Sequence, residues 1–229
     1  MKRSRRIAFY GGTFDPVHRG HLEVATKVLQ LFEIDELLFV PAQVAPHKVS
    51  RAVTPGLHRF AMLALATQAN ARLLVSTFEL DAPGRCYTVD TLAHFKAELL
   101  EPVRLFFIMG ADSWGEVTSW RDWERLLTMT NHIVVTRPGY DLSVKGLAPS
   151  LAERIVDLRV AAAEGVSQIV NNSRGENIFI TDAVMEDISA TAIRRAARAD
   201  ACEQLAALVP LPVADYIRKY KLYRDTNGR

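Results

Sequence analysis

The residues best suited to chemistry lie near the N-terminus, in the segment Gly11-Gly12-Thr13-Phe14-Asp15-Pro16-Val17-His18-Arg19-Gly20-His21. The two glycines follow a short apolar run and would let a ligand approach the backbone closely. His18 and His21 are three residues apart and would share one face of a following helix. The free N–H groups and the dipole of a helix start attract negative charge. The segment therefore predicts an anion site, with imidazoles that donate hydrogen bonds to a polyphosphate.

Two other interpretations of His18 and His21 stay open at this point. Their spacing suits a two-histidine metal site, although no third cysteine, histidine or carboxylate stands at a recognisable offset. Both imidazoles would also fit a structural role within the turn. The segment is neither a Walker A loop nor a GxGxxG dinucleotide loop. If the pair binds phosphate, we expect both imidazoles to be neutral in the free protein, because a helix N-terminus disfavours a further cation.

A second polar segment, Ile188-Ser189-Ala190-Thr191-Ala192-Ile193-Arg194, reads as another helix start. Thr191 and Arg194 would share one helix face and suit a phosphate that approaches the helix end. Ser189 also fits a purely structural role as the N-cap.

The elements that must position these residues follow an alternating pattern. Predicted strands cover 7–10, 37–41, 73–79, 104–109, 132–136 and 177–181, and predicted helices cover 18–32, 57–70, 88–100, 122–128, 149–164, 189–199 and 213–220. Residues 165–176, with Gly, Ser and Asn-Asn, predict a loop. The alternation predicts an α/β fold, a Rossmann-like doubly wound parallel sheet with helices on both faces and a small C-terminal helical part.

Length and composition agree with one domain over 1–229, with a solvated basic lead-in at 1–6 and a C-terminal helical part at 185–223. The 229 residues are 49% hydrophobic and 24% charged, which is typical of globular proteins and excludes disorder. The net charge is +2, so a dedicated nucleic-acid-binding domain is not indicated. No apolar run approaches the roughly 20 residues of a membrane-spanning helix. Cys86 and Cys202 lie far apart, which favours reduced thiols and a cytoplasmic location.

The two polar segments together resemble the signature motifs (H/T)xGH and ISxTxxR of a nucleotidyltransferase superfamily. Between them, further segments resemble the bacterial nicotinate-nucleotide adenylyltransferases, and the likeness spans 7–223. These segments are Pro46-His47-Lys48, Tyr87-Thr88-Val89-Asp90-Thr91-Leu92, Gly110-Ala111-Asp112-Ser113 with Trp120, Arg137-Pro138-Gly139, and Tyr216-Ile217 with Leu222-Tyr223.

The resemblance implies transfer of the adenylyl group of ATP to nicotinate mononucleotide, giving deamido-NAD and pyrophosphate in NAD biosynthesis. Catalytic roles are implied for His18, His21 and Arg194. The implied ATP-binding residues are Gly11, Gly12, Thr13, Phe14, His18, Gly20, His21, Gly110, Asp112, Ile188, Ser189, Thr191 and Arg194. The implied mononucleotide-binding residues are His47, Lys48, Tyr87, Thr88, Trp120, Arg121 and Arg137. Mg²⁺ is implied as the companion of ATP, held largely by phosphate oxygens and water, and no residue is assigned as a metal ligand.

Within these sets, Trp120 is implied to stack on the nicotinate ring, and amides near Thr88 and Arg121 to bind its carboxylate. Thr88 by itself also fits a plain N-cap. Trp114 and Trp123 are predicted to lie in the core. Three residues depart from the family pattern, namely Cys86, Arg121 and Ala190.

Alternative functions are a sibling transferase that uses nicotinamide mononucleotide or phosphopantetheine, and a non-catalytic nucleotide-binding regulator. The expected partners are ATP and nicotinate mononucleotide, without nucleic acid or membrane. A homo-oligomer is compatible with the sequence.

Overall fold

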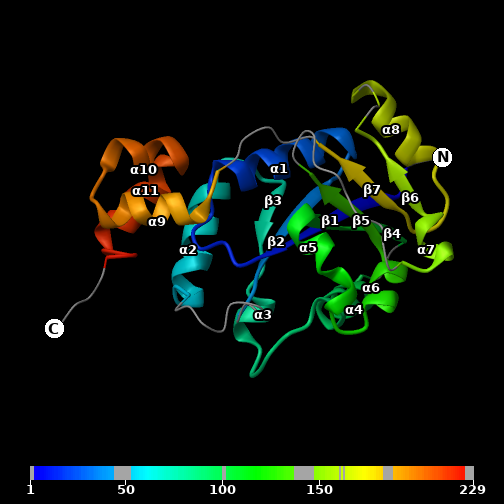
Figure 1. Ribbon diagram of the computed structural model, residues 1–229, viewed down its shortest axis with the longest axis horizontal. Coiled ribbons are helices and arrows are strands. Elements are labelled where there is room, and N and C mark those ends of the chain that lie inside the picture. The colour runs from blue at the N-terminus through cyan, green and yellow to red at the C-terminus, as the bar shows by residue number, and fades with distance from the viewer. Residues whose placement is uncertain are drawn as a thin grey trace. The chain divides into compact units, whose positions relative to one another are not determined.

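The computed structural model describes residues 3–43, 53–99, 102–136, 147–159, 161, 163–182 and 188–224 (Figure 1). Over these ranges seven strands form one sheet in the order β3-β2-β1-β4-β5-β7-β6. The strands are β1 (Arg5–Gly12), β2 (Glu36–Pro41), β3 (Leu73–Val75), β4 (Val103–Gly110), β5 (Asn131–Val135), β6 (Ile155–Asp157) and β7 (Ile178–Thr181). The pairs β1·β4, β4·β5, β5·β7 and β6·β7 are parallel.

The helices of the described residues follow the strands in alternation and then continue as a C-terminal group. They are α1 (Arg19–Leu31), α2 (Gly56–Thr67), α3 (Phe78–Asp81), α4 (Thr88–Glu98), α5 (Ala111–Gly115), the 3₁₀ turn η1 (Val117–Ser119), α6 (Trp123–Met129), α7 (Pro149–Ala152), α8 (Ala163–Asn172), α9 (Ala190–Arg198), α10 (Cys202–Leu208) and α11 (Leu211–Lys219). The predicted fold class, a parallel α/β sheet with C-terminal helices, is confirmed. None of the described helices is both long and apolar enough to cross a membrane.

The centre of the sheet carries the apolar core. In β4 the run from Leu105 to Met109 is buried throughout, as expected for a strand covered on both faces. Tyr10 of β1 is the register partner of Ile108 of β4, so the carboxyl ends of these two strands are neighbours. The strand order reverses at this pair, and in open α/β sheets ligands bind where the order reverses.

The predicted strand at 73–79 is wrong in its second half. The strand β3 ends at Val75, and a single helical turn, α3, begins at Phe78. The Ser76 hydroxyl accepts a hydrogen bond from the Phe78 backbone N–H at 3.1 Å. This local side-chain bond offers the backbone a turn in place of a longer strand.

The predictions for residues 149–176 are also wrong. The helix expected over 149–164 is the short α7 followed by the strand β6, whose Ile155 pairs with Ile178 of β7. The loop expected over 165–176 contains most of the helix α8. Val166 and Val170 of α8 are four residues apart and buried, so tertiary packing overrides the weak helix propensity of the glycine and asparagines around them.

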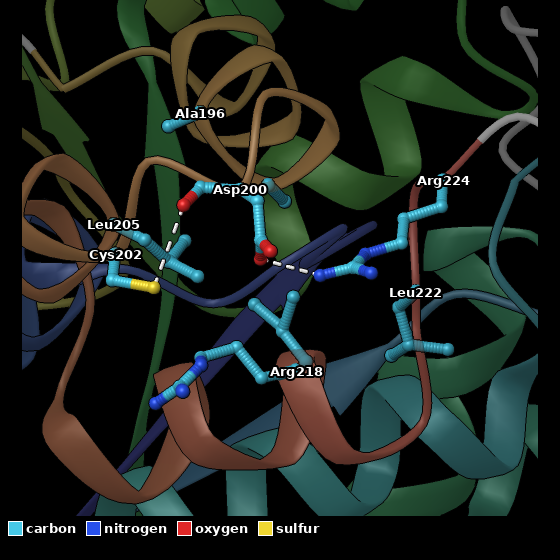
Figure 2. A pocket seen from close by; sticks show the side chains of 9 residues that line it. Ala196, Asp200, Cys202, Leu205, Arg218, Leu222 and Arg224 are labelled. Carbon is cyan, nitrogen blue, oxygen red and sulfur yellow. Dashed lines mark hydrogen bonds and ion pairs between the residues drawn. The ribbon is translucent and has the colours of Figure 1, made fainter.

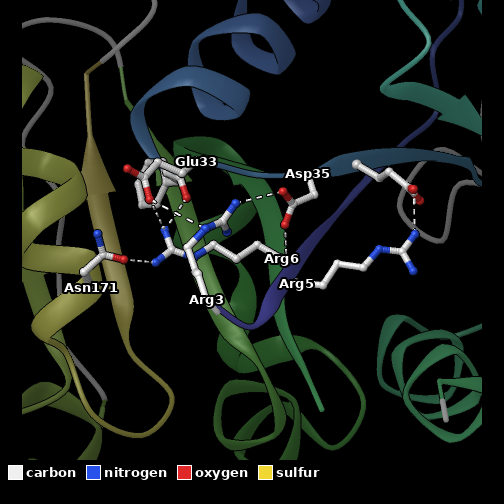
Figure 3. Close-up of polar contacts among 8 residues, drawn as sticks. Arg3, Arg5, Arg6, Glu33, Asp35 and Asn171 are labelled. Atoms are coloured by element: carbon white, nitrogen blue, oxygen red, sulfur yellow. Dashed lines mark hydrogen bonds and ion pairs between the residues drawn. The ribbon is translucent and has the colours of Figure 1, made fainter. Parts of the chain in front are cut away.

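The expectation of a solvated basic stretch over residues 1–6 holds for the exposed residues 3–5 and fails at Arg6. The strand β1 begins at Arg5, and Arg6 is only 2% exposed. Its guanidinium donates to the Phe32 carbonyl at 2.6 Å and to the Asn171 side chain, and it lies 3.6 Å from the Glu33 carboxylate (Figure 3). Burial of a charge is tolerated here because hydrogen bonds and a carboxylate compensate it.

The chain divides into two compact units. One comprises 1–11, 24–38 and 86–185, and the other comprises 12–23, 39–85 and 186–229. In the first unit α4 packs with α6, and α5 lies against β4 and β5 (Figure 1). In the second unit α9, α10 and α11 form the C-terminal helical group, with α11 packed on α2 (Figure 1).

Candidate functional site

The two histidines of the N-terminal segment lie at the start of α1, in the second unit. The helix begins at Arg19, one residue later than predicted, and the His18 carbonyl accepts hydrogen bonds from the N–H groups of His21 and Leu22 at 3.0 and 3.3 Å. The two imidazole rings stack, with their centroids 3.7 Å apart and their planes at 27°. The sequence spacing therefore becomes a pair of adjacent rings at a helix N-terminus.

A hydrogen bond determines the tautomer of the neutral His21 ring, and burial determines the pKa of His18. His21 Nδ1 accepts a hydrogen bond from the His18 backbone N–H at 3.3 Å, which assigns the proton of the neutral ring to Nε2. His18 is 8% exposed, and burial lowers its pKa to about 4. This lowering agrees with the neutral imidazole expected for His18, with burial as its cause. Its buried Nδ1 has no hydrogen-bond partner among the described residues.

The position of His18 explains why residue 20 is a glycine. A Cβ on Gly20 would lie 3.3 Å from His18 Nδ1 and 3.7 Å from the Cβ of Ile188. The first of these contacts is tighter than normal packing, so His18 would have to move. The glycine between the two histidines thus permits the stacked arrangement. The 3.7 Å distance to Ile188 is ordinary contact, and it shows that the second sequence motif lies beside the first.

The other glycines of the segment make room for aromatic rings. A Cβ on Gly11 would lie 3.2 Å from the ring of Phe107, and one on Gly12 would lie 2.9 Å from the ring of Phe14. Phe14 has a φ of 49° and is buried, and its ring meets His21 edge-on at a centroid distance of 5.0 Å. Phe14 therefore packs against the His21 ring and helps to hold it in place.

Arg194 connects the second motif to the first. Its Nη1 donates to the Asp15 carbonyl at 2.6 Å, and its Nη2 donates to the Thr191 hydroxyl at 3.0 Å. Ser189 occupies the N-cap position of α9 but makes no side-chain cap bond, and both Ser189 and Thr191 are exposed. Within this unit the structure thus brings together a stacked histidine pair, an arginine and two accessible hydroxyls, a set of donors suited to a polyanion.

One residue of this unit, Arg59, was missed by the sequence analysis. It is 1% exposed in the first turn of α2, and its guanidinium donates to the carbonyls of Thr13, Thr54 and Gln43 at 2.7, 2.8 and 3.3 Å. Burial lowers its pKa, while the nearby Asp15 carboxylate raises it. The signal was available in the sequence, because Arg59 shares the buried helix face of Met62 and Leu63, where a charge needs dedicated partners.

The implied acceptor residues that the structure describes, Tyr87, Thr88, Trp120 and Arg121, belong to the first unit. Thr88 is the first residue of α4, so the N-cap is Tyr87 and the plain N-cap reading of Thr88 is wrong. The Arg121 guanidinium lies over the Tyr87 ring, 4.6 Å from its centroid. Trp120 follows η1, and its buried Nε1 has no hydrogen-bond partner within the described part of the chain.

The remaining implied residues are placed as follows. Gly110 ends β4 and Asp112 is exposed in the first turn of α5. Trp114 is buried as predicted, and Trp123 is half-buried. His47, Lys48 and Arg137 lie outside the described residues.

The donor set of the described residues does not suggest a metal site built from protein ligands. Over those ranges, no group of three or more His, Cys, Asp or Glu side chains could hold a metal ion. Arg194 donates to the Asp15 carbonyl and Arg59 to the Thr13 carbonyl of the same segment, and cationic donors beside this segment suit phosphate oxygens better than a bare cation.

Comparison with known proteins identifies the family of the chain. A cytidylyltransferase-like family model matches residues 9–196. A protein of a Thermoanaerobacter species, named a probable nicotinate-nucleotide adenylyltransferase, is 37% identical over 233 residues and all of both chains. A protein of the same name from Leifsonia xyli is 39% identical over 98% of this chain and 96% of its own.

Among solved structures, the Plasmodium falciparum nicotinic acid mononucleotide adenylyltransferase complexed with NaAD matches with a TM-score of 0.69. The match covers 96% of this chain and 97% of that one at 20% identity, and it shows a shared fold. The family model spans both the glycine–histidine segment and the start of α9, and relatives match the chain over its full length. The chain therefore belongs to the cytidylyltransferase-like family.

Proposed function

We propose that the protein transfers the adenylyl group of ATP to nicotinate mononucleotide, forming deamido-NAD and pyrophosphate in NAD biosynthesis. The observation that carries the proposal is the donor set of the second unit, where the stacked His18 and His21 and the Asp15-bound Arg194 converge on one segment. Relatives named for this reaction match the chain over its full length. The acceptor-side residues Tyr87 and Trp120 lie at the helix start and the turn that the resemblance requires.

The reaction is an in-line displacement at the α-phosphorus. An oxygen of the mononucleotide phosphate forms the new P–O bond, the bond to the bridging oxygen of the β-phosphate breaks, and pyrophosphate leaves with the electron pair. The attacking oxygen is already anionic at neutral pH, so no general base is needed. Catalysis then consists of positioning the two substrates and stabilising the charge that grows on the leaving group.

The residues of the second unit fit these tasks. His21 Nε2 carries the proton of the neutral ring, because Nδ1 is engaged by the His18 backbone, and it is the donor toward the triphosphate. His18 is neutral at pH 7, because burial holds its pKa at about 4, so binding of a phosphate beside its unpartnered Nδ1 would raise that pKa. Arg194, with Ser189 and Thr191, takes the β- and γ-phosphates. Mg²⁺ enters with ATP and is held by phosphate oxygens and water.

On the acceptor side, Trp120 offers a flat ring for stacking on nicotinate. The first-turn N–H groups of α4, at Thr88 and Val89, have no carbonyl to bind within the helix and suit the nicotinate carboxylate. An acceptor with an amide in place of the carboxylate would present a donor to these donors, which disfavours it. We also propose a cytoplasmic location, supported by the absence of a disulfide at either Cys86 or Cys202.

Pyrophosphate release from ATP and Mg²⁺ tests the proposal, with nicotinate mononucleotide, nicotinamide mononucleotide and phosphopantetheine offered in parallel. Turnover with the first alone is the expected result. Comparable rates with both pyridine nucleotides would show that the N–H groups of α4 do not select the nicotinate carboxylate. No turnover with any acceptor would refute the proposed adenylyl transfer. His21→Ala is expected to lower kcat by about 100-fold or more with little loss of stability, as for removal of a preorganised donor.

A further inference from the structure

Asp15 connects three parts of the second unit through three different atoms. Its Oδ1 accepts a hydrogen bond from the Tyr223 hydroxyl at 2.8 Å, and its Oδ2 accepts one from the Thr54 N–H at 3.4 Å. Its backbone carbonyl accepts the 2.6 Å bond from Arg194. The carboxylate is thus held from one side by Tyr223, while the carbonyl of the same residue holds Arg194.

The segment that carries Tyr223 is itself fixed to the C-terminal helices. The Tyr223 carbonyl accepts a hydrogen bond from Arg198 Nε of α9 at 3.1 Å, and the Leu222 N–H donates to Ile217 of α11 at 3.0 Å. Arg224 forms an ion pair with Asp200, beside a small hollow of about 10 Å³ that Leu222 helps to line (Figure 2). Contacts on both sides of Tyr223 therefore determine where its hydroxyl lies.

The chemistry of the Tyr223 hydroxyl suits a permanent donor. Burial and the Asp15 carboxylate both raise the pKa of Tyr223, so the hydroxyl keeps its proton at neutral pH. Its backbone φ of 68° lies in the left-handed region, a conformation that non-glycine residues adopt when their surroundings dictate it.

We propose that Tyr223 is a positioning residue for the triphosphate site, which acts through Asp15 on Arg194. The hydroxyl fixes the Asp15 carboxylate, the Asp15 carbonyl then holds Nη1 of Arg194, and the guanidinium keeps the direction in which it meets the leaving pyrophosphate. This inference rests on the proposed function, since it needs Arg194 to contact the phosphates. It adds to the site a residue of the segment that follows α11, outside both sequence motifs.

Tyr223→Phe removes the hydroxyl and keeps the ring, and Tyr220→Phe is its matched control. Tyr220 lies three residues earlier, is 49% exposed and contacts His58 and Tyr216 through its ring. We expect Tyr223→Phe to lower kcat by about tenfold and to weaken ATP binding several-fold, as for loss of one hydrogen bond to a charged group. The KM for nicotinate mononucleotide should change less than about twofold, and Tyr220→Phe should match the wild type.

The decisive measurement is the same substitution in an Arg194→Ala background. If Tyr223 acts through Arg194, Tyr223→Phe changes neither kcat nor the calorimetric Kd of ATP further in that background. An equal loss in both backgrounds, or none in the wild-type background, would overturn the proposal. Asp15→Asn keeps one amide oxygen as an acceptor for the Tyr223 hydroxyl and loses the acceptor of the Thr54 N–H. Its loss should show the same dependence on Arg194, and it replaces Tyr223→Phe in the test if that variant has a low Tm.

The ATP affinities also separate this inference from the proposed function. If the wild type shows no turnover with nicotinate mononucleotide, the proposed function fails. The calorimetric titrations with ATP alone still report whether Tyr223 depends on Arg194.

Discussion

Replacement of Arg59 by methionine would remove a buried guanidinium and keep a straight side chain of similar reach. In the native structure the guanidinium satisfies three carbonyls, two of them at 2.7 and 2.8 Å and the third at 3.3 Å. A hydrogen bond that involves a charged group contributes about 1.5–3 kcal/mol, and a buried acceptor left unpaired carries a similar cost. If only the two short bonds are counted, Arg59→Met should lower the free energy of unfolding by about 3–6 kcal/mol.

Equilibrium unfolding in urea at neutral pH measures this loss directly. Arg59→Lys keeps the charge but has a single ammonium for the carbonyls of Thr13, Thr54 and Gln43, so it should lose about half as much. Arg174→Met is the control, because Arg174 is exposed and its replacement should change stability by less than about 0.5 kcal/mol. A loss below about 1 kcal/mol for Arg59→Met, with an unchanged m-value, would show that these carbonyls do not depend on Arg59.

Three further changes probe other parts of the molecule. Gly20→Ala should lower turnover about tenfold, because the new Cβ displaces His18, while the gain in helix propensity keeps stability near that of the wild type; wild-type kinetics would contradict this reason for the glycine. His132 is fully buried, and burial lowers its pKa from 6.5 to about 3. The unfolded chain therefore binds a proton at His132 that the native protein does not, and this residue should lower stability by about 1.4 kcal/mol per unit as pH drops from 6.5 toward 3. Urea titrations at several pH values should show a shallower decline in His132→Gln, and identical slopes would refute the assignment. Trp120→Leu should raise the KM for nicotinate mononucleotide about tenfold, with the KM for ATP within twofold, if its ring stacks on the acceptor; equal effects on both substrates in steady-state kinetics would argue for a purely structural Trp120.

The sequence predicted best what depends on strong local patterns. The apolar run of β4 and the helical period of α1 located these elements to within a residue or two, and their alternation indicated the parallel sheet. The prediction for residues 149–176 was wrong because the local sequence pattern is weak there. Ile155 to Asp157 become a strand only because β7 lies beside them, and Val166 and Val170 form a helix because both are buried.

The residues of the candidate site likewise fall into those that the sequence predicted and those that it did not. Motif spacing found the residues that would touch phosphate, such as His21 and Arg194, because their chemistry is visible in their side chains. It did not find Arg59 or the role of Tyr223, which act on carbonyl and carboxylate oxygens of other segments. Such roles depend on which distant backbone groups the fold brings near, and residue type alone does not carry that information.

The bond between Asp15 and Tyr223 joins residues that are 208 positions apart. The entropy cost of closing a chain loop grows with the length of the loop, so such a contact forms only once the segments between the two residues are in place. Local unfolding of the segment that carries Tyr223 would break this bond, while the start of α1 keeps its own short-range hydrogen bonds. The phosphate site therefore combines a local part that can form early in folding with a long-range part that forms late.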